Sequence, residues 1–458
     1  MAPVSESSGD MTSETSRYSM HRSLASEPHM VDHAKGSYLY LSSGKKILDG
    51  CGGAAVVSVG HADDGIVAAL KDQLETVHYV HTLDYTTRAA EAVANQMLKP
   101  YKGTLAKAYF VNSGSEANEA AMKMAVQYFY ETGKPQKTEF ISRLQSYHGN
   151  CLGGLSLSSH VSRRAPFEGV LSDHVHFVSP ANEYRYKAED QTTAQYVEQL
   201  ANELENKILE IGQNKIAAFV AETIVGATSG CMTAPAGYFK AIRAVCEKYD
   251  VLLILDEIMC GSGRTGTFFA WEQEDVVPDI VTCGKALSGG YGPLSACICT
   301  PKIIEGLEMG SKAFNNGHTY QAFPLSCRAG LAVLKKVEEE NLLKNVKSKG
   351  QYLSSELKKA LKDSKIVGNI RGRGLFWGIE FVSDISTKSP FDPLLKVGPT
   401  IQSMAWQSGV AVYPGTGTVD GKFGDHILIS PMFNVTEEEI DIIVSAVSKS
   451  VYEFENSL

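Results

Sequence analysis

The sequence lacks the features that mark several classes of protein. It has no long run of lysine and arginine among its 458 residues, and its formal net charge is −9. Binding to nucleic acid or to an anionic membrane surface requires clustered basic residues, so we expect neither partner. No apolar run approaches the roughly 18 residues that cross a bilayer. We therefore expect no membrane-spanning segment.

The nine cysteines follow no spacing typical of a disulfide framework or a zinc site. Most of them, including Cys297 and Cys299, stand in apolar stretches. Reduced and mostly buried thiols are the usual arrangement in an intracellular protein. The sequence thus predicts no metal site and a cytoplasmic location. The N-terminus is polar and rich in serine and threonine, without the apolar core of a signal peptide.

From about residue 107 onward, short apolar runs alternate with helical patterns. The runs cover residues 108–111, 139–142, 216–222 and 251–257. Strands that are apolar throughout, alternating with helices, are typical of a mainly parallel sheet covered on both faces. The sequence therefore predicts an α/β fold. In such sheets the functional site lies beyond the carboxyl ends of the strands.

The chain is too long to fold around a single hydrophobic core, and its length predicts one large and one smaller domain. Residues 336–363 are strongly charged with apolar positions at helical spacing, and we expect one long helix that leaves the large domain. Strand patterns and a closing helix follow it. The expected division is a disordered tail (1–33), the first part of the small domain (34–75), the large domain (76–335) and the rest of the small domain (336–458).

Polar residues follow several of the apolar runs directly. Glu222 and Asp256 end such runs, and Lys285 closely follows a further short one at Ile280 and Val281. Because carboxyl ends of parallel strands meet at one edge of a sheet, we expect these side chains around one crevice. Each has an ordinary interpretation when taken alone. Asp256 could cap a helix or pair with Arg264, and most lysines are solvated surface residues.

The segment NSGSEA (112–117) follows one run and opens a helix. A helix N-terminus offers unpaired N–H groups and a positive dipole, so Gly114 and Ser115 can bind an anion such as phosphate. A serine-capped helix with glutamate three residues later gives the same pattern without a ligand. No Gly-Lys-Ser/Thr follows, which excludes a Walker loop.

Three further side chains favour one small molecule. Tyr147, in a loop, can stack on a planar ring, although loop packing explains a lone aromatic equally well. Asp256 is costly to bury unless it meets a positive charge, such as a protonated ring nitrogen. Lys285, if desolvated, becomes a nucleophilic amine that can react with an aldehyde. Together with the anion site, these features fit pyridoxal 5′-phosphate (PLP).

Over roughly residues 34–450 the sequence resembles the class III aminotransferases. The motifs that carry the resemblance are GH (60–61), NSGSEANEAAMKMA (112–125), YHG (147–149), AETIVGA (221–227), LLILDEIMCGSGRTGTFFAWE (252–272), PDIVTCGKALSGGYGPLSA (278–296), GHTYQAFPLSC (317–327), IRGRGLFWGIEF (370–381) and GDHILISP (424–431). The resemblance implies the aspartate-aminotransferase-like fold type I. That fold has a large domain with a mainly parallel, seven-stranded-type sheet and a smaller α/β domain, and it forms a homodimer.

The resemblance also implies a role for each matching residue. Lys285 is the lysine that forms the Schiff base with the cofactor and moves the proton of the 1,3-shift. Asp256 keeps the pyridine nitrogen protonated, and Tyr147 stacks on the ring. The cofactor-binding set is Ser113, Gly114, Ser115, Tyr147, His148, Glu222, Asp256 and Lys285, with Thr319 contributed by the second subunit of the homodimer.

The implied activity is that of a PLP-dependent transaminase. An amine or amino-acid donor leaves its nitrogen on the cofactor, and a keto acid, pyruvate or 2-oxoglutarate, then collects it in a ping-pong reaction. A decarboxylase, aminomutase or lyase on the same fold is an alternative, because substrate orientation decides which bond breaks. A non-catalytic scaffold would be expected to have lost cofactor residues, whereas Lys285, Asp256 and Tyr147 are all present.

Three positions depart from the family pattern, and all concern the substrate side or the cofactor. Met259 stands where many members have glutamine, and Thr223 stands where proline often follows the glutamate. Some members carry an arginine before the GDH stretch that receives the keto acid's carboxylate. Here Lys422 is the only nearby cation in the sequence. The identity of the substrate therefore stays open.

The aromatic segment HYVHTLDY (78–85) is the remaining candidate for substrate contact. We expect it to line the entrance, with Tyr79 and His81 facing the substrate. Such a wall would favour an apolar or aromatic amine. The same aromatic side chains could equally pack at the dimer interface.

Overall fold

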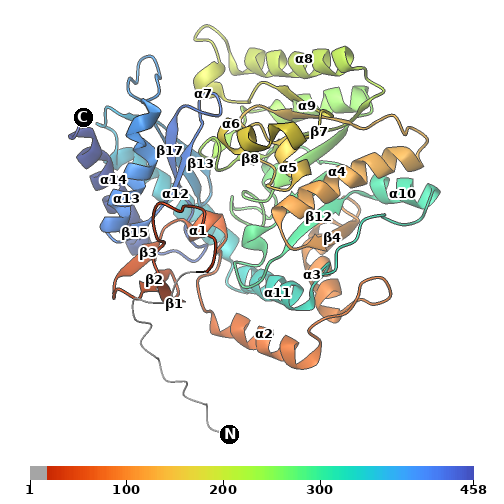
Figure 1. The fold of residues 1–458 in the computed structure, drawn as a ribbon, viewed down its shortest axis with the longest axis horizontal. Helices are drawn as coiled ribbons and strands as arrows, with labels where there is room; N and C mark the ends of the chain where they lie inside the picture. Colours follow the sequence, from red (N-terminus) through yellow and green to blue (C-terminus); the bar gives the residue numbers. More distant parts are fainter. Residues whose placement is uncertain (1–17) are drawn as a thin grey trace.

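The computed structural model of this chain describes residues 18–458, and a seven-stranded sheet lies at its centre (Figure 1). In spatial order the strands are β4 (Lys107–Val111), β12 (Ser295–Cys299), β11 (Ile280–Cys283), β10 (Leu252–Glu257), β7 (Ile216–Glu222), β5 (Glu139–Arg143) and β6 (Val175–Val178). Only β12 runs antiparallel to its neighbours. The α/β fold class and the mainly parallel sheet are thereby confirmed.

Helices cover both faces of this sheet. They are α3 (Arg88–Leu98), α4 (Gly114–Glu131), α5 (Leu152–Leu157), α6 (Val161–Arg164), α7 (Glu183–Tyr186), α8 (Thr193–Ile211), α9 (Tyr238–Lys248), α10 (Pro301–Met309) and α11 (Pro324–Glu339). Helices α3, α8, α9 and α11 contribute to one buried cluster, and α4, α5 and α10 contribute to another. A short hairpin of β8 (Ile224–Val225) and β9 (Met232–Thr233) follows β7.

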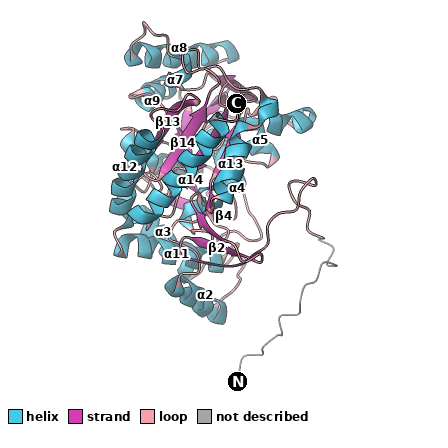
Figure 2. Ribbon diagram, turned by 90° about the vertical axis from the view of Figure 1, so that its left-hand side faces the viewer, coloured by secondary structure: helices cyan, strands magenta, loops and turns pink. Residues whose placement is uncertain are grey.

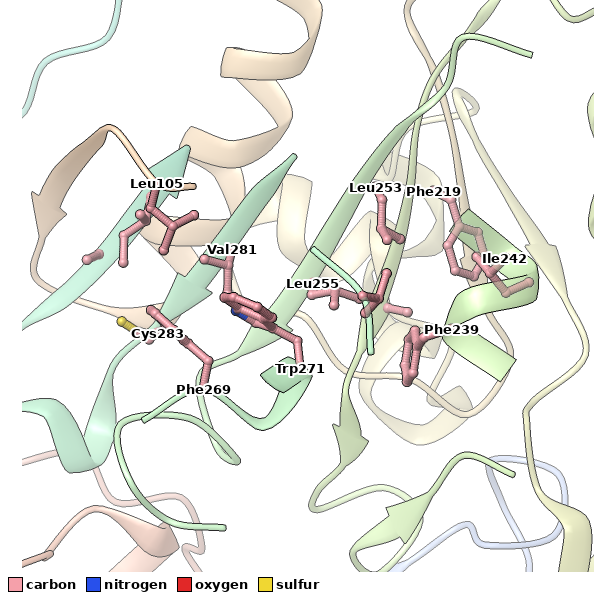
Figure 3. Packing of buried hydrophobic residues seen from close by; sticks show 14 of the residues in the cluster. Leu105, Phe219, Phe239, Ile242, Leu253, Leu255, Phe269, Trp271, Val281 and Cys283 are labelled. Atoms are coloured by element: carbon pink, nitrogen blue, oxygen red, sulfur yellow. The ribbon is translucent and has the colours of Figure 1, made fainter. Parts of the chain in front are cut away.

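The two clusters explain why the central strands are apolar throughout. Leu253 and Leu255 of β10 pack with Phe239 of α9 in one cluster, as Figure 3 shows. Leu252 and Ile254 of the same strand belong to the other cluster, with residues of α4. Successive side chains of a strand point to opposite faces, so a sheet buried on both faces needs an apolar residue at every position.

A second region is built from the two ends of the described chain. One sheet has the order β13 (Val367–Arg373), β14 (Phe376–Phe381), β17 (Asp425–Ile429), β16 (Tyr413–Thr416), and another has the order β1 (Val31–Lys35), β2 (Tyr38–Leu41), β3 (Lys46–Asp49), β15 (Val410–Ala411). Helices α12 (Leu342–Ala360), α13 (Val397–Gln407) and α14 (Glu437–Glu455) pack near β13 and β14 (Figure 2). Helices α1 (Gly52–Ala55) and α2 (Asp64–Thr76) complete the N-terminal part.

The pairing of β3 with β15 joins residues 46–49 to residues 410–411. Leu48 and Val410 enter the same buried cluster, with side chains of α13 and α14. The division into domains at the boundaries given above stays a prediction. Of the tail expected over 1–33, residues 1–17 lie outside the described residues. Strand β1 begins at Val31 within that stretch, because it pairs with β2.

The single long helix expected over 336–363 is wrong. Helix α11 ends at Glu339, and α12 begins at Leu342. Asn341 between them has a φ of 51°. This left-handed backbone conformation stops a right-handed helix, and asparagine adopts it more readily than most residues. The chain therefore turns between two helices at this point.

All nine cysteines are free, and only Cys151 is exposed. The expectation of reduced, mostly buried thiols is confirmed. Burial raises the pKa of several of these thiols, including those of Cys246 and Cys283 to about 12. Within residues 18–458, no helix is both long and apolar enough to cross a membrane.

Candidate active site

A cavity of about 280 Å³ lies at the carboxyl ends of the parallel strands. Its walls include Ser113, Gly114, Ser115, Tyr147, His148, Glu222, Asp256 and Lys285. The strand register explains this convergence, because Asp256 pairs with Glu222 on one side and with Thr282 on the other. Lys285 follows β11 after a single intervening glycine beyond Cys283. The structure thus brings together the side chains that the sequence placed around one crevice.

The carboxylate of Asp256 is held by several donors. Its Oδ2 accepts a hydrogen bond from Asn118 Nδ2 at 2.8 Å and lies 2.8 Å from His148 Nδ1. Its Oδ1 accepts from the backbone N–H of Ile258 at 3.0 Å. Burial alone would raise the pKa of Asp256, but His148, Ile258 and Asn118 outweigh it and hold the pKa below its ordinary value. A buried carboxylate that stays ionised is a suitable partner for a protonated ring nitrogen.

Glu222 holds the loop that carries Tyr147. Its Oε1 accepts from the backbone N–H of Tyr147 at 3.0 Å, and its Oε2 accepts from that of Gly226 at 2.9 Å. Burial, together with the nearby charge of Asp256, raises the pKa of Glu222. These two backbone bonds fix where the Tyr147 ring stands in the cavity wall.

Lys285 brings an amine into the cavity from a strained backbone position. Its φ is 45°, a left-handed conformation that is uncommon for residues other than glycine. Burial lowers the pKa of Lys285 to about 8, although the charges of Asp256 and Glu222 act in the opposite direction. About a tenth of this amine is therefore unprotonated at pH 7, far more than for an ordinary lysine, and the unprotonated form is the nucleophile.

The start of α4 both caps itself and offers free donors. Ser113 Oγ accepts from the backbone N–H of Glu116 at 3.2 Å, and the Glu116 carboxylate accepts from the N–H of Asn112 at 2.8 Å. The helix is therefore capped, as the interpretation without a ligand predicts. The N–H groups of Gly114 and Ser115 point from the first turn, where α-helices leave donors unpaired. A Cβ on Gly114 would lie 2.7 Å from Ile258, so this position requires glycine.

Two residues near the site were not predicted from the sequence. Asn118, on the second turn of α4, also accepts from Thr282 Oγ1 at 2.8 Å and so links α4 to β11. Arg163 places its guanidinium carbon 4.4 Å from the centroid of the Tyr147 ring. Helical spacing from Gly114 could have indicated Asn118. Arg163 belongs to a four-residue helix, which is too short to give a periodic pattern.

The four remaining predicted residues do not border the cavity of this single chain. Thr319, Tyr79 and His81 are exposed, and the Tyr79 ring lies 5.9 Å from that of Tyr320 in an edge-on contact. Lys422 is also exposed, with its ammonium 5.3 Å from the centroid of the Phe423 ring. Their roles stay predictions. Met259 does line the cavity, where its thioether packs against Gly226.

The residues of the cavity fit pyridoxal phosphate. Unpaired amides at the start of α4 suit a phosphate, and the Tyr147 ring suits a flat heterocycle. An ionised Asp256 suits a pyridinium N–H, and an amine of lowered pKa at Lys285 suits an aldehyde. One molecule has all four of these groups.

The lowered pKa of Lys285 predicts a pH dependence that can be measured on the apoenzyme. Only the unprotonated amine attacks an aldehyde, so the rate of covalent cofactor attachment should rise with pH and level off above about pH 8. An ordinary lysine, with a pKa of about 10.4, would continue to gain rate up to about pH 10. Stopped-flow absorbance during reconstitution measures this rate. A profile without a plateau below pH 9 would contradict the assignment.

Comparison with known proteins gives a consistent result. Residues 20–451 match the family described as Aminotransferase class-III. The chain is 45% identical over 439 residues to "Uncharacterized aminotransferase C1771.03c" of Schizosaccharomyces pombe, with 96% of each chain covered. It is 36% identical to "Gamma aminobutyrate transaminase 3, chloroplastic" of Solanum lycopersicum, covering 94% of this chain and 82% of that protein. A solved omega transaminase from Pseudomonas jessenii, in complex with PMP, superposes with a TM-score of 0.88 at 30% identity, covering 94% of this chain and 93% of that one.

Proposed function

This chain belongs to the class-III aminotransferases, enzymes of fold type I that use pyridoxal phosphate, and we propose that it passes an amino group from an apolar or aromatic amine to pyruvate or 2-oxoglutarate. The observation that carries the proposal is the convergence of Lys285, Asp256 and Tyr147 on one cavity. The donor class follows from the prediction that the aromatic segment 78–85 lines the entrance to this cavity. The relatives named γ-aminobutyrate transaminases make that amino acid a second donor to test.

We propose a role for each residue from its surroundings. The amides of Gly114 and Ser115 bind the phosphate, and the Tyr147 ring, fixed by Glu222 through its backbone, stacks on the heterocycle. Asp256 keeps a proton on the ring nitrogen, since its own pKa is held low. When bound, pyridoxal phosphate supplies an electron sink for the carbon that carries the amino group. Lys285 can take a proton from that carbon and return it, because its amine titrates near the working pH.

The test is a panel of donors and acceptors with the purified, cofactor-loaded protein. Aromatic and aliphatic amines, alanine and γ-aminobutyrate are each paired with pyruvate or 2-oxoglutarate. Consumption of keto acid should equal formation of the new amino acid, with aromatic or apolar amines reacting fastest. Release of carbon dioxide, or isomerisation without net amino transfer, would indicate the decarboxylase or aminomutase alternative. A preference restricted to alanine-like donors would contradict the proposed donor class.

We also propose that the enzyme works as a homodimer in the cytoplasm, with Thr319 of each subunit completing the phosphate site of the other. Leu83, Tyr85 and Tyr320 support an interface there, since they expose 80%, 64% and 57% of their surface in the single chain. Sedimentation should give twice the mass of the chain. Thr319→Ala should weaken cofactor retention about tenfold, through loss of a hydrogen bond to a charged group. A monomer that is fully active would contradict this proposal.

A further inference from the structure

Arg163 stands beside the cavity without a carboxylate partner. It lies on α6, half-buried, with its guanidinium over the Tyr147 ring and a hydrogen bond to the Tyr147 hydroxyl. Tyr147 itself lines the cavity that contains Lys285. The charge of Arg163 reaches that lysine, because it adds to burial in lowering the pKa of Lys285. Arg163 therefore acts electrostatically on the reacting centre.

The other arginines show how unusual this arrangement is. Within residues 18–458, the arginines that donate to a carbonyl or carboxylate are Arg143, Arg164, Arg185, Arg243, Arg264, Arg328, Arg371 and Arg373. Three have neither kind of partner in that part of the chain, namely Arg22, Arg88 and Arg163. Arg22 and Arg88 are exposed, so their donors face solvent. The protein partners of the Arg163 guanidinium are thus the ring and hydroxyl of Tyr147, which leaves most of its five N–H donors available to a ligand.

The backbone that carries Arg163 is firmly held. The neighbouring Arg164 donates through Nη1 to the carbonyl oxygens of Leu155, Ser156 and Ser158 at 3.1, 3.0 and 2.6 Å. His160 lies just before α6. Its Nδ1 is 3.0 Å from Ser162 Oγ, and its Nε2 is 3.1 Å from the carbonyl oxygen of Thr416. Groups that bind substrate need such support, since a displacement of about 1 Å weakens them. The position of Arg163 is thus set by the fold.

The charges in the cavity create a need for such a cation. Asp256 is ionised, and Glu222 lies next to it, so a substrate carboxylate would meet negative charge. Lys285 is the only lysine or arginine among the cavity-lining residues, and its amine is used in the reaction, while His148 is paired with Asp256. Lys422, the cation that the sequence offered, is exposed on its loop. Of the two arginines whose charge reaches Tyr147, Arg163 contacts its ring, whereas Arg22 is exposed.

We propose that Arg163 binds the carboxylate group of the keto-acid substrate at the mouth of the Lys285 cavity. This inference rests on the proposed transaminase function and adds the residue that selects its acceptor. A guanidinium presents two parallel N–H donors that match a carboxylate. The Tyr147 ring holds the guanidinium plane through a cation–π contact, which lowers the entropy lost on binding. An acceptor without a carboxylate gains nothing from Arg163.

The first test separates acceptor binding from chemistry. In Arg163→Gln, the KM for pyruvate should rise at least about tenfold, as expected when a charge-assisted hydrogen bond is lost. The kcat and KM for an uncharged aldehyde acceptor, butanal, should be unchanged. Arg163→Lys keeps the positive charge but loses the two parallel N–H donors of the guanidinium. Its KM for pyruvate should lie between those of the wild-type protein and Arg163→Gln. Lys240→Gln removes a charge from an exposed position on α9 and should leave every constant unchanged.

The second test does not depend on turnover. Propanoate carries the carboxylate without the reactive carbonyl, and calorimetry of the holoenzyme measures its binding. Its affinity should fall at least about tenfold in Arg163→Gln and stay the same in Lys240→Gln. If Arg163→Gln impaired the reactions of pyruvate and butanal equally, Arg163 would only hold Tyr147 in position, and the inference would be wrong. Unchanged affinity for propanoate in Arg163→Gln would also overturn the inference. A wild-type protein that transfers no amino group refutes the proposed function, while the propanoate titration still decides on Arg163.

Discussion

Lys285→Ala should lose transamination almost completely, with a fall in kcat of at least about four orders of magnitude. The variant removes both the amine that attaches to the cofactor and the group that moves the proton, and losses of this size follow when one residue has two roles. The cavity would keep Asp256, Tyr147 and the start of α4, so the variant should still bind pyridoxal phosphate without a covalent bond. Single-turnover assays with the best donor measure the rate.

Lys137 provides the matched control for this prediction. Burial lowers its pKa to about 8 as well, so its basicity resembles that of Lys285. Its Nζ is occupied, however, since it donates to the carbonyl oxygens of Ile216 at 3.0 Å and of Asp250 at 2.6 Å. Borohydride reduction followed by mass spectrometry of the wild-type protein should therefore locate the cofactor on Lys285 and leave Lys137 unlabelled. Cofactor fixed on any other lysine, or activity that survives in Lys285→Ala, would refute the assignment.

The contrast between these two lysines shows what the sequence could predict of the site. Lys285 follows a buried strand, and the order of strands and helices alone indicated that it would meet Asp256 and Glu222 at one edge of the sheet. That reasoning depends on the geometry of parallel strands, which is the same in every such fold. The neighbours that set each pKa depend on side-chain packing between distant segments. Asn118 and His148 contact Asp256 across more than a hundred residues, and no sequence pattern predicts such distant contacts.

Two features of the fold were not predicted from the sequence, namely the strand at 295–299 and the helix break at Asn341. Strand β12 reads SACIC, a pattern of small and sulfur-containing residues that carries little strand preference by itself. It becomes a strand because it fits between β4 and β11, where Ala296 and Ile298 enter one core and Cys297 and Cys299 the other. The break at Asn341, in contrast, is caused by the backbone conformation of one residue. One residue in a left-handed conformation ends a helix whose charge and apolar spacing continue on both sides.

Asp256→Asn should reduce kcat by about 10²- to 10³-fold, the usual cost of removing a preorganised charge from the reacting centre. Asparagine keeps the shape, but its single amide oxygen can replace only one of the two acceptors used by Asn118 and Ile258, and it cannot hold a proton on the ring nitrogen by charge. The electron sink is weakened for that reason. Measurement of kcat and of the cofactor dissociation constant separates this effect from simple loss of the cofactor.

A graded series around Asp256 tests the cause as well as the size of this loss. Asn118→Ala removes one neutral donor and should cost about tenfold, since a single hydrogen bond to a charged group is lost. His148→Ala removes the partner that contributes most to lowering the pKa of Asp256, so that pKa should rise. The ionised carboxylate of Asp256 is the active form, so a raised pKa means that activity is lost as the pH falls. Activity of His148→Ala should fall as the pH is lowered over a range in which the wild-type protein is insensitive. Parallel pH–kcat profiles for the two proteins, or an Asp256→Asn variant with full activity, would show that the ring nitrogen does not depend on this carboxylate.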